Sequence, residues 1–214
     1  MLNGIQLDAL LYRIAALLLA IAVHDAVQAA AALMLGDRTA KEERRLTLNP
    51  VAHLSAIGLL PVLFGPFGWS KPIPVDRDRL QGRTALRATL IYACGPIANL
   101  ALGIVLWWVA FQLPAAVDGW MPAWLYELIR GILEWSYIMN MMFVLLHLLP
   151  FYPMDMWLIV RGWLPAAWAP ALNKREKLGI AVLFGLAVTP IGQLLFQNGF
   201  EWLSGLIMDL YAWG

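Results

Sequence analysis

The chain has 214 residues, of which 61% are hydrophobic and only 14% are charged. Soluble domains usually carry roughly 25% charged residues, so this composition fits a lipid bilayer better than water. The net charge of +1 argues against nucleic acid as a partner, and the single cysteine excludes an internal disulfide and a cysteine-based zinc site.

Four apolar stretches are long enough, or nearly so, to span a membrane as helices, which takes about 20 residues. In chain order they are Ala9–Leu35, Ala88–Leu113, Leu125–Leu149 and Leu178–Phe196. A fifth stretch, Phe200–Trp213, is shorter and carries two acidic residues, so we expect an interfacial helix there. The whole chain, residues 1–214, is therefore predicted to be one all-α polytopic membrane domain with four to five membrane helices.

The segment that follows the first span, Leu46–Val75, has an irregular composition. Its start, Leu46-Thr47-Leu48, is short and β-prone and is followed by the turn signal Asn49-Pro50. Its end, Lys71–Val75, contains two prolines and suits only an edge strand. We expect a membrane-associated β-hairpin or re-entrant segment, which is stable at membrane depth only when protein covers it or when it faces a wet cavity.

Basic residues predict the orientation of the spans. They concentrate in the segments 36–87 and 161–177, whereas the loop Pro114–Ala123 has none. We therefore expect both basic segments on the cytoplasmic side and the N-terminus outside.

Two places in the apolar sequence carry chemically active side chains. The first is His24-Asp25-Ala26-Val27-Gln28, inside the first span, where ionisable groups are costly and indicate function. His24 and Gln28 are four residues apart and share one helix face, which is the spacing of the zinc motif H-E-x-x-H with two of its three letters changed. The second place is the end of the third span, where Pro150 and Pro153 stop the helix and Asp155 follows.

Together these motifs resemble the site-2 protease family of intramembrane zinc metallopeptidases, in its compact bacterial form. The resemblance runs from the first span to Val160. It includes Gly95-Pro96-Ile97-Ala98-Asn99-Leu100, which is similar to the family's G-P-x-x-N-L. It also includes Pro150 and Asp155, which have the separation of the family's N-x-x-P-x-x-x-x-D-G. The resemblance implies a bacterial inner-membrane protein with zinc held by two histidines of the first span and an aspartate after the third. In that family a glutamate activates the zinc-bound water, which cuts a substrate helix.

The chain departs from this pattern at the positions that perform the chemistry. His24 and Asp155 match two metal ligands, but Gln28 stands at the second histidine, and an amide is a weak zinc ligand. Asp25 stands at the general base and is shorter than glutamate by about 1.5 Å. His147 and Met156 replace the family's Asn and Gly. We therefore predict a degenerate motif and a proteolytically inactive homologue without a cofactor, with zinc only if the site still works.

Three functions remain open at this stage. The first is a binding or assembly subunit for a transmembrane helix or a larger membrane complex, which adds a partner strand along 46–50. That partner surface would comprise Leu46, Thr47, Leu48, Asn49, Pro50 and Asn99, although Asn99 also suits close packing of the second span. The second is an active metalloendopeptidase with an atypical site, such as a rebuilt ligand set of His24, His147 and Asp155. The third is a proton or ion pathway that uses His24, Asp25, His147 and Asp155 as a relay.

Overall fold

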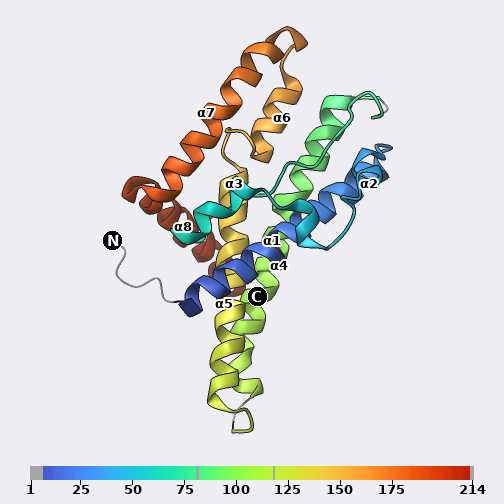
Figure 1. The fold of residues 1–214 in the computed structure, drawn as a ribbon. Helices are drawn as coiled ribbons and strands as arrows, with labels where there is room; N and C mark the ends of the chain where they lie inside the picture. Colours follow the sequence, from blue (N-terminus) through green and yellow to red (C-terminus); the bar gives the residue numbers. More distant parts are fainter. Residues whose placement is uncertain (1–6, 81, 118, 213–214) are drawn as a thin grey trace.

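Every regular element of the described chain is a helix (Figure 1). The structure is a computed structural model that describes residues 7–80, 82–117 and 119–212. Six helices are long: α1 (Leu7–Met34), α4 (Thr84–Ala116), α5 (Ala123–His147), α6 (Asp155–Trp163), α7 (Ala169–Val188) and α8 (Pro190–Ala212). The short ones are α2 (Thr39–Glu42), η1 (Pro50–His53), α3 (Ala56–Leu59), η2 (Leu60–Leu63) and η3 (Ala166–Trp168).

The helices α1, α4 and α5 are long and apolar enough to cross a membrane, and they coincide with three of the predicted spans. They also pack against one another in all three pairs, with α1 crossing the other two obliquely (Figure 1). Small buried residues such as Ala16 and Ala20 line α1, and small side chains let membrane helices approach closely. The chain is therefore an integral membrane protein built around this three-helix bundle.

The predicted span Leu178–Phe196 is not one continuous helix. It is broken at Thr189, between α7 and α8, which meet at a bend of 80°. Thr189 is extended because Pro190 follows it, and Pro190 then starts α8 at a position where its missing N–H costs nothing. The pair α7–α8 is long and apolar enough to form a fourth, broken crossing.

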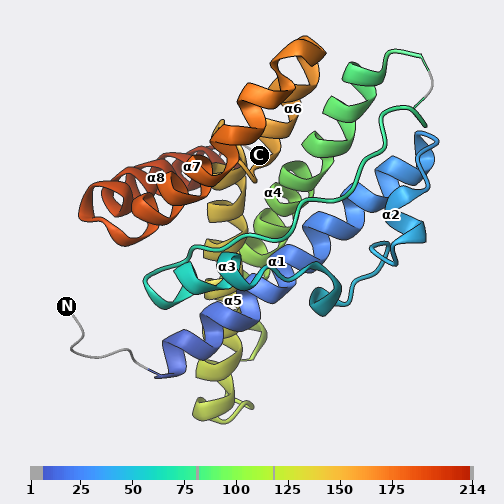
Figure 2. The ribbon, with the colours of Figure 1, turned by 45° about the horizontal axis from the view of Figure 1, so that its top comes forward.

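The predicted β-hairpin in Leu46–Val75 is wrong, because the described residues contain no strand. Its two arms meet in a single antiparallel bridge, Leu54 with Ser70. Next to that bridge the Trp69 N–H donates to the Gly58 carbonyl at 3.0 Å. Prolines on both arms lack the N–H groups that a longer ladder would need, so short helical turns and extended chain form instead. Figure 2 shows this segment running along α1.

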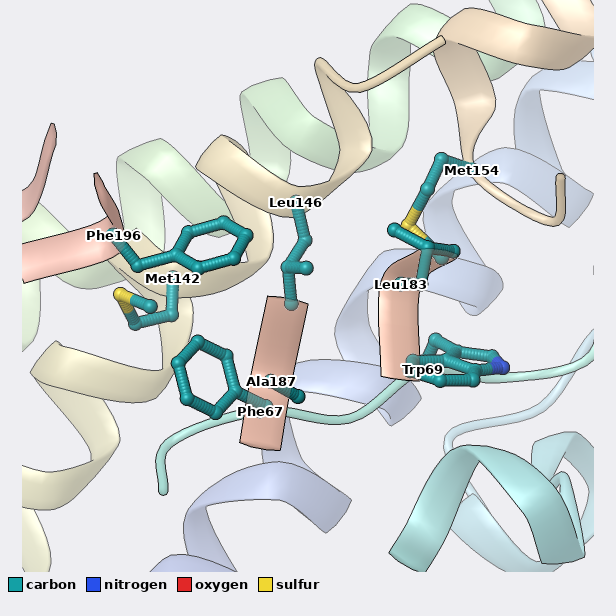
Figure 3. Close-up of a cluster of buried hydrophobic side chains, with 8 residues drawn as sticks. All are labelled: Phe67, Trp69, Met142, Leu146, Met154, Leu183, Ala187 and Phe196. Atoms are coloured by element: carbon teal, nitrogen blue, oxygen red, sulfur yellow. The ribbon is translucent and has the colours of Figure 1, made fainter. Parts of the chain in front are cut away.

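Protein covers the segment on its other side. Phe67 and Trp69, both nearly fully buried, pack in one apolar cluster with residues of α5, α7 and α8 (Figure 3). The α5 members are Met142 and Leu146, and Leu183 comes from α7. The irregular segment thus packs between α1 and the C-terminal helices. It contributes residues to one side of the site described below.

Three basic residues that precede or begin α4, Arg77, Arg79 and Arg87, lie at one end of the molecule. Arg79 Nη1 pairs with Glu42 Oε2 at 2.7 Å, and Arg87 Nη1 donates to the Leu35 carbonyl at 3.2 Å. Arg77 Nη2 donates to the Gly162 carbonyl at 2.6 Å, which joins the loop before α4 to α6. The loop between α4 and α5 lies at the opposite end (Figure 1). This separation agrees with one basic and one non-basic side, and the cytoplasmic placement of the basic side stays a prediction.

Candidate functional site

The polar residues in the middle of α1 face two directions. His24 and Gln28 are four residues apart and therefore lie on one face, whereas Asp25 is turned about 100° away. All three are buried, with 1%, 1% and 2% of their surfaces exposed for His24, Asp25 and Gln28. They consequently belong to two separate polar centres.

The first centre, called the His24 centre below, joins α1, α5 and α6. It contains His24, Gln28, His147 and Asp155. The Nε2 atom of His24 lies 3.0 Å from Oδ2 of Asp155, and the rings of His24 and His147 have centroids 4.3 Å apart. One ligand atom from each of His24, His147 and Asp155 lies within 4.8 Å of the other two. The structure thus brings together both predicted ancestral ligands and the predicted substitute ligand.

Asp155 reaches this centre because α5 ends shortly before Pro150 and Pro153, as the sequence predicts. After α5 ends at His147, a short turn leads to the extended residue Met154, and Asp155 opens α6. A carboxylate at this position is favoured by the positive end of the helix dipole. Burial raises the pKa of the Asp155 carboxyl, whereas positive charge on His24, when that ring is protonated, and the Gln28 amide lower it, and the net direction is below the ordinary value.

Gln28 acts as a donor in the His24 centre. Its Nε2 donates to the backbone carbonyl of Tyr92 at 3.0 Å and to Oδ1 of Asp155 at 2.8 Å, and it also lies 3.1 Å from Nε2 of His24. Since a carbonyl can only accept, the first bond fixes which end of the amide faces the centre. Gln28 therefore presents its NH₂ group, and not the oxygen that could bind a metal.

A buried amide chain orients His24 from behind. The Nδ2 of Asn99 donates to the Ala20 carbonyl at 3.2 Å and to Oδ1 of Asn140 at 2.8 Å, so Oδ1 of Asn99 is left to accept. That oxygen lies 2.6 Å from Nδ1 of His24, which must carry the proton. Asn99 is fully buried and so is not part of an exposed partner surface in this structure. It supports His24 as well as packing the second span.

The second centre, called the Asp25 centre below, lies between α1 and the irregular segment. Asp25 Oδ1 accepts from the Ser70 hydroxyl at 2.9 Å, and Oδ2 accepts from Arg45 Nη2 at 3.2 Å. The Nδ1 atom of His53 lies 3.1 Å from the same Oδ2 and accepts from Arg45 Nε at 3.2 Å. Arg45 also donates to the Lys71 carbonyl at 2.8 Å. Both oxygens of the residue at the general-base position are therefore engaged by structural partners.

The predicted partner-binding stretch 46–50 lies on the outside of the molecule. Leu48 is 68% exposed, and Asn49 caps η1 by accepting from the Val51 N–H at 3.1 Å. The Thr47 carbonyl lies 2.9 Å from Nε2 of His53, so the stretch is anchored to the Asp25 centre. Its partner role stays a prediction, and strand addition loses its basis because the stretch is not a strand.

Sequence reasoning missed Arg45, Ser70 and the Tyr92 carbonyl as members of the two centres. Arg45 could have been considered, because a charge beside the apolar residues 46–48 needs a partner if it is buried. Nothing in the sequence sets Ser70 apart from other serines, and the contacts of a backbone carbonyl cannot be read from a sequence. Gly95 has a clear role: a Cβ there would lie 2.5 Å from His24 Nε2 and 2.6 Å from Gln28 Nε2, so only glycine lets α4 approach the His24 centre this closely.

A comparison with known proteins indicates the family of the chain. A curated relative from Bacillus subtilis (strain 168), named "Putative zinc metalloprotease YwhC", is 32% identical over 181 residues, which is 85% of this chain and 82% of the relative. No family model and no solved structure matches the chain. This identity over most of both chains, with the apolar helices and the His24 centre, shows that the protein belongs to the metalloprotease family of YwhC, as a site-2-protease-like membrane protein.

Proposed function

We propose that this protein has kept the membrane fold of its family but does not hydrolyse peptide bonds, and that it serves as a binding or assembly subunit in the membrane. The observation that carries the first part is the engagement of Asp25. A general base must lie within hydrogen-bonding reach of the water that it deprotonates. Asp25 instead accepts from Ser70 and Arg45, on a helix face turned away from His24.

Closure of the His24 centre supports the same proposal. His24 is 1% exposed, and His147 and Asp155 are each 4% exposed. A metal ion in this centre would supply Lewis-acid polarisation and an acidic bound water. A peptide carbonyl would nevertheless have to displace packed helices before it came near these side chains.

A groove beside the bundle supports the partner role. It has a volume of about 390 Å³ and lies between α1, α5, α8 and the 64–67 turn. Arg13 lies in this groove over the Trp135 ring, 4.7 Å from its centroid, and its Nε has no hydrogen-bond partner among the described residues. A charged group within a membrane helix normally finds a partner, so we propose that a partner helix brings an acidic or amide side chain to Arg13.

The hydrolysis proposal is tested by comparing the wild-type protein with the Asp25→Asn and His24→Ala variants. Each is reconstituted in liposomes with zinc and a set of single-span helical peptides, and fragments are measured by mass spectrometry. We expect the three proteins to give the same background, because Asp25 is a structural residue. Fragments that appear with the wild type and disappear with both variants would instead establish an active metallopeptidase.

The assembly proposal is tested on protein extracted gently from membranes, with particle mass measured by native mass spectrometry. We expect the chain to be part of a complex with at least one other polypeptide, and we expect Arg13→Gln to reduce that complex severalfold. Arg130→Gln is the matched control, because Arg130 pairs with Glu134 on the exposed surface of α5. A lone monomer, or equal loss with both variants, would contradict the proposal.

A further inference from the structure

The His24 centre has the donor set of a metal site, although one family ligand is missing. Its three candidate ligands come from three different helices, yet one ligand atom of each falls within 4.8 Å of the others. Two imidazoles and a carboxylate are a set that zinc and similar divalent ions accept. The set is buried, so it is protected from exchange with competing ligands in solvent.

Both imidazoles are already oriented for metal binding. Nδ1 of His24 donates to Asn99 at 2.6 Å, and Nδ1 of His147 donates to the Phe143 carbonyl at 2.9 Å. Histidines that bind metals almost always donate their other ring N–H to a carbonyl or carboxylate in this way. In the neutral His147 ring the Nε2 lone pair is thereby left for a metal. Nε2 of His24 also faces the Gln28 amide nitrogen at 3.1 Å, a contact that a bound metal would replace.

One oxygen of the Asp155 carboxylate accepts a hydrogen bond, and the other has no hydrogen-bond partner among the described residues. Oδ1 accepts from Gln28, whereas Oδ2 is buried without a hydrogen bond, even though it lies 3.0 Å from His24 Nε2. These two facts agree because a neutral His24 ring that carries its proton on Nδ1 has no proton on Nε2 to donate. Buried polar atoms are nearly always satisfied, and an unsatisfied one often marks a missing ion or water.

We propose that His24, His147 and Asp155 bind one divalent ion of the zinc class, and that His147 has taken over the place of the ligand lost at position 28. Gln28 is then a positioning residue that holds Asp155 through its NH₂ group. The inference rests on the proposed function, since it assigns a ligand to the same closed centre. It does not require hydrolysis, because a metal held by three helices can stabilise the fold without a general base.

The test is metal binding by the purified full chain. Metal-free protein in detergent is titrated with Zn²⁺ or Co²⁺, the bound metal is measured by elemental mass spectrometry, and the visible absorption of bound Co²⁺ reports the geometry of its ligands. We expect one equivalent for the wild type and a loss of affinity of at least 100-fold for His147→Asn and for Asp155→Asn. Asn99→Ala should weaken binding about 10–100-fold, which is typical for the partner of a metal-binding histidine.

The control variant is His53→Gln, which removes the only histidine outside the His24 centre and should leave the metal stoichiometry unchanged. If His147→Asn does not fold, the Co²⁺ spectrum of the wild type still decides, because Co²⁺ in a tetrahedral protein site absorbs far more strongly than octahedral Co²⁺ bound at an adventitious surface position. Unchanged affinity in His147→Asn, or no bound metal in the wild type, would overturn this inference and leave the proposed function standing. Metal binding together with cleavage would overturn the proposed function and leave this inference standing.

Discussion

Arg45→Met is expected to destabilise the folded protein by about 3–5 kcal/mol, which is the usual cost of leaving one partner of a buried ion pair alone. Asp25 is 1% exposed and would lose its only guanidinium partner, while His53 and the Lys71 carbonyl would each lose a donor. The measurement is unfolding in mixed micelles by titration with a denaturing detergent, followed by tryptophan fluorescence.

Two further variants separate this effect from a general sensitivity to charge. Adding Asp25→Asn to Arg45→Met should recover a large part of the loss, because the buried charge is gone, and the double-mutant cycle measures the coupling. Arg79→Met breaks the exposed Arg79–Glu42 pair and should cost less than about 1 kcal/mol. Equal destabilisation by Arg45→Met and Arg79→Met would show that the Asp25 centre is not a buried ion pair.

Gly58→Ala is expected to destabilise the protein by about 3 kcal/mol, at the upper end of the cost of overpacking. A Cβ at this position would lie 2.0 Å from the Trp69 carbonyl oxygen and 2.8 Å from Cδ1 of the same residue. A backbone atom cannot move aside like the end of a flexible side chain. The contact between α3 and the extended chain at Trp69 would therefore be lost. The same detergent titration measures the loss.

The matched control for Gly58 is Gly205→Ala in the interior of α8. A Cβ there meets nothing within 4 Å, so the helix should gain about 0.5–1 kcal/mol from the lower flexibility of alanine. The two alanine substitutions thus have opposite expected signs. If Gly58→Ala were neutral, the packed description of the Leu46–Val75 segment would be contradicted.

The sequence predicts the bundle well because a long apolar run has few alternatives at membrane depth. The helices α1, α4 and α5 follow directly from such runs. The break at Thr189 had a readable signal in Pro190, but an apolar run on both sides favoured a continuous span. The β-hairpin prediction failed because the prolines of this segment lack the N–H groups that a ladder needs, and this outweighs the β propensity of its other residues.

The site was predictable in its members but not in their contacts. The spacing of His24 and Gln28 and the position of Asp155 place these residues near one another through the family resemblance. The partners of Asp25, however, come from residues 20, 28 and 45 positions further along the chain, and their meeting depends on the path of an irregular segment. Likewise, only the Tyr92 carbonyl reveals that Gln28 donates to Asp155.

We propose that the His24 centre is closed and lacks a working base, so that even a loaded centre does not cut peptides. The most direct measurement determines bound zinc and peptide cleavage on the same reconstituted preparation, with His24→Ala as the reference. We predict that fragments of helical peptides from the zinc-loaded wild type stay at the level of His24→Ala. Cleavage that rises in proportion to bound zinc and is absent in His24→Ala would contradict the account.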